Sequence, residues 1–152
     1  MPAIHNNKIV LYSHVVISIA FGLFFMYAGI KKFIPRPTPK SVDNSEFVQA
    51  FTDNVFESPV TFKLGIKALK ASGFLKMVGV LQILSSLLIL IPRTRLIGLL
   101  LLLPIAVNIF CFHFFMDNRP GENIETGSLL AINILLITFY YNKLKALFIH
   151  KL

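Results

Sequence analysis

Long uncharged, apolar stretches dominate the pattern of hydrophobic and polar positions. About 20 helical residues, each rising roughly 1.5 Å, cross a hydrocarbon core of roughly 30 Å. The first and third stretches reach that length, and the other two reach it when their polar ends extend toward the membrane surface. The pattern predicts one all-α domain, an integral membrane four-helix bundle. Its transmembrane helices are expected at about 9–32, 74–91, 95–116 and 125–142.

Proline and glycine mark the turns between the predicted helices. The four residues from Pro92 to Arg95 leave room only for a tight turn, so the second and third helices are expected to form an antiparallel hairpin. Asn118–Gly121 forms an equivalent turn before the fourth helix. Pro104 lacks a backbone donor in the middle of the third helix and predicts a kink, which membrane helices tolerate.

The long connection between the first two helices, residues 33–73, carries two amphipathic patterns. Phe47, Phe51 and Val55 recur at helical spacing and, with Glu46 in the first turn, predict a short amphipathic helix. The second helix is expected between Ser58-Pro59 and Gly73. An apolar row on it runs beside a basic row: Phe62, Ile66 and Leu69, against Lys63, Lys67 and Lys70. Such a helix either lies in the membrane interface or caps the end of the bundle.

Composition and charge narrow the class of protein. Hydrophobic residues make up 55% and charged residues 14% of the 152 residues, against about 25% charge in soluble domains. These values exclude a soluble enzyme, a disulfide-stapled secreted module and a disordered tail. The net charge of +8 does not indicate a nucleic-acid partner, because the Lys and Arg residues lie mainly at the ends of apolar stretches, where topology and lipid headgroups require them. The single cysteine, Cys111, excludes an intrachain disulfide.

The first apolar stretch is too long for the core of a signal peptide, so we interpret it as a membrane helix. The chain is then a multi-pass membrane protein, of the cytoplasmic (inner) membrane if its source is bacterial. All seven acidic residues fall on one predicted face, which also holds nine of the 15 Lys and Arg residues, most of them in the long connection. The face with both termini holds six, among them Arg93 and Arg95 in the tight turn and the lysines of the basic tail, and short turns weigh more than long loops in setting topology. We therefore expect cytoplasmic termini.

Three carboxamides interrupt the apolar stretches: Gln82, Asn108 and Asn133. Counted from the acidic face, each lies roughly 12–14 Å deep in its helix, and Gly22 of the first helix falls at the same level. One interpretation is interhelical hydrogen bonding, worth about 0.6 kcal/mol per contact. The alternative is a polar pocket at mid-membrane depth.

Further polar side chains lie between this layer and the acidic face. His113 ends the third helix and Glu125 opens the fourth, so they are candidates for a proton-accepting pair or part of a ligand site. Tyr27, Lys31 and Lys32 end the first helix. The lysines could instead pair with acidic residues such as Glu125 and join helix ends. The candidate pocket therefore comprises Gln82, Asn108, His113, Asn133, Tyr27, Lys31, Lys32 and Glu125.

Small residues along one side of the first helix predict a packing seam: His14, Ser18, Gly22 and Gly29. No catalytic nucleophile–base pair, metal-ligand spacing or glycine-rich phosphate loop is recognisable, so no catalytic or metal residue is assigned.

Residues 23–33, LFFMYAGIKKF, and residues 77–117 resemble the DoxX family of small four-helix membrane proteins. Gly29 and Lys32 at the end of the first helix carry part of the resemblance. The other matching positions are Pro92, Arg95, Asn108 and His113. Family members often carry Glu where Gln82 aligns, so the resemblance does not imply a proton-linked role for that residue.

The resemblance implies an accessory or ligand-binding subunit linked to membrane redox chemistry, as in the small subunits of quinone-linked oxidoreductases. No cofactor is evident, and the expected ligand is a lipophilic molecule or a quinone that enters between helices. An alternative is an assembly factor or chaperone that works through residues 45–72. A small transporter ranks last, because no charged residue lies at mid-depth. Expected partners are the lipid bilayer and either another membrane protein or a second copy of the chain.

Overall fold

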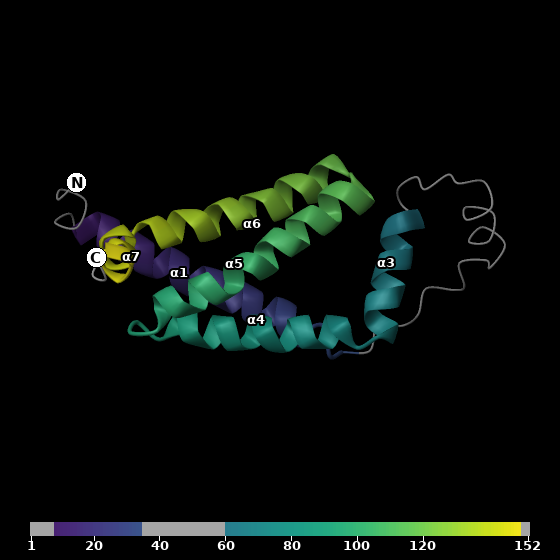
Figure 1. Ribbon diagram of the computed structural model, residues 1–152, viewed down its shortest axis with the longest axis horizontal. Helices are drawn as coiled ribbons and strands as arrows, with labels where there is room; N and C mark the ends of the chain where they lie inside the picture. Colours follow the sequence, from purple (N-terminus) through teal and green to yellow (C-terminus); the bar gives the residue numbers. More distant parts are fainter. Residues whose placement is uncertain (1–7, 35–59, 150–152) are drawn as a thin grey trace.

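Figure 1 shows a computed structural model of the protein, which describes residues 8–34 and 60–149. Within these ranges the chain is helical, without strands. The elements are α1 (Lys8–Ile30), α3 (Val60–Ala71), α4 (Phe74–Leu90), α5 (Arg95–Phe112), the π-helical turn η2 (His113–Asp117), α6 (Pro120–Thr138) and α7 (Tyr141–Ile149). The predicted all-α class is confirmed.

Two helical stretches are long and apolar enough to cross a membrane. They are α1 and the continuous Arg95–Asp117 stretch of α5 and η2, with 23 residues each. A third is obtained if α3 and α4, whose axes are bent by 83°, form one broken span. With 17 residues, α4 alone is short for a membrane span. In α6, Glu122 and Glu125 in the first turns lower the mean hydropathy of the helix. Among the described residues, the fold is therefore that of a membrane protein with two or three candidate spans.

The helices begin and end close to the predicted positions. The second and third predicted helices begin at Phe74 and Arg95, as expected. In contrast, α6 begins at Pro120, because proline suits the first position of a helix. It ends at Thr138, and the basic tail continues as the separate helix α7.

Each long helix packs against the next one along the chain: α1 on α4, α4 on α5 and α5 on α6 (Figure 1). Glycine permits the closest contacts. A Cβ atom at Gly29 would lie 2.9 Å from the carbonyl oxygen of Gly79, and one at Gly98 would lie 2.6 Å from that of Ser85. The backbone of α4 thus directly contacts both of its neighbours. The predicted seam on α1 is confirmed, since its four members are all buried: His14, Ser18, Gly22 and Gly29.

The core lies where α1, α4, α5 and α6 meet. Its buried apolar side chains are Phe21, Phe25, Ile89, Leu99, Leu102, Ile105 and Leu136. Only 28% of the most apolar window of each 23-residue stretch is buried inside the protein. The remaining apolar surface faces outward, as expected of helices that are hydrophobic all round and contact lipid.

The turn between α4 and α5 is closed by two side chains that cap the end of α4. The Thr94 hydroxyl donates to the Leu88 carbonyl at 2.9 Å, and Nε of Arg95 donates to the Ile89 carbonyl at 2.9 Å. These bonds satisfy carbonyl groups that have no partner within the helix. Arg95 is consequently buried, a role that its position at a helix end did not indicate.

The helix α3 caps one end of the bundle. Gly73 adopts a left-handed backbone conformation, with φ of 77°, where the chain turns from α3 into α4. The Phe62 ring lies 5.3 Å from the ring of Phe112 and 5.0 Å from that of His113. The second predicted amphipathic helix is therefore present, and it makes the contacts expected of a cap. The first, around Phe47, Phe51 and Val55, lies outside the described residues.

Candidate functional site

The structure pairs two of the eight candidate residues, Lys32 and Gln82. The Lys32 ammonium donates to the side-chain oxygen of Gln82 at 2.6 Å and to the Ala28 carbonyl at 3.3 Å. Gln82 is buried and Lys32 half-buried. The lysine thus extends along the end of α1 and supplies a donor to a carboxamide inside the α1–α4 contact.

The expected depth of Gln82 relative to α1 is wrong. A Cβ atom at Gly22 would contact Ile89 at 3.2 Å, whereas one at Gly29 would contact Gln82 at 3.2 Å. Gly22 therefore lies about 10 Å from the level of Gln82, seven residues along α4. Counting residues from helix ends assumes that all the helices begin at one level. Instead, the first turn of α4 lies beyond the end of α1, where the chain arrives from α3.

Tyr27 and Lys31 lie on the outside of α1. The Lys31 ammonium is 4.5 Å from the centre of the Tyr27 ring, a cation–π contact. Both side chains are exposed. Their arrangement is typical of a tyrosine and a lysine at the level of lipid headgroups.

Asn108 lies on the exposed face of α5. Its amide nitrogen donates to the Pro104 carbonyl one turn earlier, at 3.0 Å. A polar side chain on a lipid-facing surface can satisfy part of its hydrogen-bonding capacity on its own helix in this way. Asn108 is therefore directed away from the interior that contains Gln82 and Asn133.

Asn133 is fully buried, with 0% of its surface exposed. Neither its amide nitrogen nor its carbonyl oxygen has a hydrogen-bond partner. It lies in the second half of α6, 13 residues or about 20 Å from Pro120 and five residues before the end of the helix at Thr138. Asn133 is thus a buried carboxamide able both to donate and to accept.

His113 belongs to a charged network where α5, η2 and α6 meet. Its Nδ1 atom lies 3.3 Å from Asp117 and 3.8 Å from Glu122. Arg119 donates to both carboxylate oxygens of the buried Asp117, each at 2.7 Å, and lies 3.3 Å from Glu122. The hydrogen bond to Asp117 raises the pKa of the Arg119 guanidinium, so this side chain remains a cation.

Glu125 was the predicted acidic neighbour of His113, whereas the structure provides Asp117 and Glu122, and Glu125 is exposed. The signal was the spacing of four between His113 and Asp117, which places two side chains on one helical face. The π-helical geometry of η2 and the early start of α6, which brings Glu122 to the histidine, were not evident.

The network also brings together three side chains of the kinds that bind metal ions. One ligand atom from each of His113, Asp117 and Glu122 lies within 4.8 Å of the others. However, Arg119 already holds both oxygens of Asp117. A metal ion would have to displace the guanidinium, so the geometry favours an ion-pair network that joins the ends of α5 and α6.

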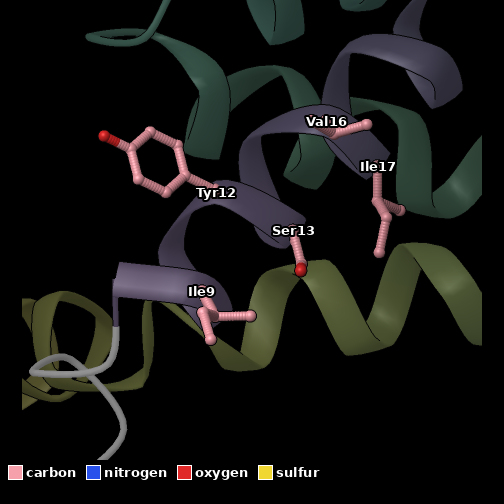
Figure 2. Close-up of a pocket in the computed structure, with 5 residues that line it drawn as sticks. All are labelled: Ile9, Tyr12, Ser13, Val16 and Ile17. Carbon is pink, nitrogen blue, oxygen red and sulfur yellow. The ribbon is translucent and has the colours of Figure 1, made fainter.

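A shallow, open groove of about 450 Å³ lies on the outside of α1. Figure 2 shows its lining residues along the first turns of the helix: Ile9, Tyr12, Ser13, Val16 and Ile17. The lining is mainly apolar, and it includes none of the eight candidate residues. The groove therefore resembles the lipid-facing surface of a membrane helix more than a polar pocket.

No protein-family model, no curated protein and no solved structure matches the chain.

Proposed function

We propose that the protein is a DoxX-like integral membrane protein of four spans that acts as an accessory subunit of membrane redox chemistry. In this proposal it binds a lipophilic ligand with a carbonyl-bearing head group, a quinone, beside Asn133. The fold, the burial of Asn133 and the chemistry of its carboxamide support the proposal in that order.

The proposal counts α4 and α6 as spans. At roughly 1.5 Å per residue, the 17 residues of α4 extend about 26 Å and the 19 residues of α6 about 29 Å. Short helices are accommodated by local thinning of the bilayer and by flanking polar residues that reach the surface. The short connections before and after α5 favour an antiparallel course, so that α4 and α6 would cross the bilayer in the opposite direction to α5.

Asn133 is the residue on which the proposal of a ligand rests. A buried polar group without a partner costs about 1–3 kcal/mol, and a bilayer offers it no water in compensation. Both polar atoms of this side chain are unpartnered and inaccessible. A bound molecule with a polar head would supply the missing hydrogen bonds.

A quinone matches this carboxamide in both of its oxidation states. The amide nitrogen can donate to a quinone carbonyl, and the amide oxygen can accept from a quinol hydroxyl. Leu136, one turn away, belongs to the buried apolar core, so the surroundings of Asn133 match the chemistry of a lipophilic molecule, and the helices would have to separate to admit it. Such a ligand would enter from the bilayer between helices.

The test measures binding of decylubiquinone to the purified full chain in phosphatidylcholine nanodiscs, by equilibrium dialysis against empty nanodiscs. The variant Asn133→Leu removes both hydrogen-bonding atoms and keeps the number and branching of the side-chain heavy atoms. Asn108→Leu is the matched control, because it makes the same change at an exposed carboxamide already bonded to Pro104. We expect Asn133→Leu to weaken binding at least about ten-fold, the equivalent of about 1.4 kcal/mol, and Asn108→Leu to leave it unchanged.

Two outcomes would contradict the proposal. If the wild-type protein binds no more decylubiquinone than empty nanodiscs do, the proposed ligand is wrong. If both variants weaken binding equally, Asn133 has no specific role in it. Circular dichroism of each variant confirms that the helices remain intact, so that a loss of binding is not a loss of fold.

A further inference from the structure

A row of lysines follows one side of α3 and continues toward α4. Lys63, Lys67 and Lys70 lie three and four residues apart and are all exposed, and Lys76 in the first turn of α4 is exposed as well. The described helix α3, residues 60–71, contains no acidic residue. The row therefore concentrates positive charge on a short surface.

The contacts that α3 makes with the bundle show in which direction the lysine row points. Phe62 packs on Phe112 and His113, and a Cβ atom at Gly65 would lie 2.8 Å from the Phe112 ring. At about 100° per residue, the three lysines project roughly 80–140° around the helix from Phe62. They therefore point sideways from the helix, neither toward the bundle nor directly away from it.

The orientation of α3 relative to the spans decides what the lysine row faces. The axes of α3 and α4 are bent by 83°. If α4 crosses the bilayer close to its normal, α3 lies almost in the plane of the membrane surface. A row on its side then faces the lipid headgroups that surround the bundle, rather than the aqueous space above it.

We infer that the lysine row of α3 binds the phosphate groups of anionic lipids and holds α3 flat at the membrane surface. Lysine suits this role, because its ammonium is a compact charge on a long flexible stem that reaches a headgroup. The occupant is a lipid rather than a soluble acidic partner, since the row faces sideways at headgroup level. This inference is independent of any ligand at Asn133.

Fluorescence quenching by brominated lipids tests the inference locally. The chain contains no tryptophan, so a single Trp introduced by Ile66→Trp reports which lipids lie next to α3. Ile66 is half-buried and lies about 40° around the helix from Phe62, on the side of the lysines. The full chain is reconstituted in phosphatidylcholine containing either brominated phosphatidylglycerol or brominated phosphatidylcholine at equal mole fraction. We expect the anionic lipid to associate with this site at least about three-fold more strongly.

The charge-removing variant Lys63→Gln/Lys67→Gln/Lys70→Gln should abolish this selectivity. The control Lys8→Gln/Lys143→Gln/Lys145→Gln removes three exposed lysines elsewhere and should preserve it. If the first triple variant does not fold, the double variant Lys63→Gln/Lys70→Gln should reduce the selectivity by at least half. Equal quenching by the two lipids in the wild-type background overturns the inference.

An arm with inorganic phosphate distinguishes a lipid from a free anion. At constant ionic strength, replacing chloride by phosphate should leave the selective quenching unchanged, because a lipid headgroup is held at high local concentration by the bilayer. Loss of selectivity in phosphate but not in chloride would assign the row to a soluble phosphate and overturn the inference.

Discussion

The ammonium of Lys32 donates a 2.6 Å hydrogen bond to the side-chain oxygen of Gln82, across the contact between α1 and α4. Lys32 lies two residues beyond the end of α1, so a long stem brings the charge to a buried carboxamide. The pair joins the two most extensively packed helices at the point where α1 ends.

We expect Lys32→Met to lower the free energy of unfolding by about 1–3 kcal/mol, because it removes a donor from a buried acceptor. Gln82→Leu should cost less, since the lysine can extend toward the surface. A double-mutant cycle of unfolding in mixed micelles measures the coupling. Additive effects of the two substitutions would show that this hydrogen bond contributes nothing to stability.

Asn133 should destabilise the ligand-free protein. Asn133→Leu removes two unpartnered polar atoms, so we expect the free energy of unfolding to rise by about 1–3 kcal/mol. Asn108→Leu, at the exposed carboxamide, should change it by no more than about 0.5 kcal/mol. Thermal unfolding in detergent compares the two variants. A marked destabilisation by Asn133→Leu would mean that this residue has a hydrogen-bond partner in the free protein.

Gly98 tests the closeness of α4 and α5. A methyl group at this position would lie 2.6 Å from the Ser85 carbonyl oxygen and 2.7 Å from the Ile89 nitrogen. Because backbone atoms cannot yield as a flexible side chain can, we expect Gly98→Ala to destabilise the protein by about 1–3 kcal/mol. Gly121→Ala is the control, since no atom lies within 4 Å of its added methyl group, and it should be neutral or stabilising by up to about 1 kcal/mol. Equal unfolding temperatures for the two variants would contradict this packing.

Arg119 should stabilise the α5–α6 connection through Asp117. Arg119→Leu leaves the buried carboxylate of Asp117 without its two guanidinium donors, and we expect the free energy of unfolding to fall measurably. Adding Asp117→Asn should recover part of this loss, because a neutral amide costs less to bury than a carboxylate. Chemical unfolding is compared with that of Arg93→Leu, a change at an exposed arginine. If Arg119→Leu is as mild as that control, the network does not stabilise the connection.

The arrangement of turns followed from local chemistry that a sequence displays directly. Proline and glycine restrict or permit particular backbone angles, so Pro92 and Gly73 indicated where helices end whatever surrounds them. The start of α6 was missed by five residues because Glu122 and Asn123 look unsuited to a membrane span. They are nevertheless compatible with a helix that extends beyond the apolar core.

The composition of the candidate site could be predicted from the sequence, but its geometry could not. In a soluble helix, the polar face shows which side is exposed. Here α1, α4 and α5 are apolar all round, since lipid and core both accept leucine and isoleucine. Periodicity therefore could not show that Asn108 faces outward while Asn133 faces inward.

By itself, the sequence determined the helical class, the membrane character and the positions of the main turns, because these depend on composition and on local backbone restrictions. The tertiary structure decided which polar groups meet. It paired Lys32 with Gln82, brought Glu122 rather than Glu125 to His113, and left Asn133 without a partner. These outcomes depend on the rotation and offset of each helix against its neighbours, which close glycine contacts such as Gly29–Gly79 determine.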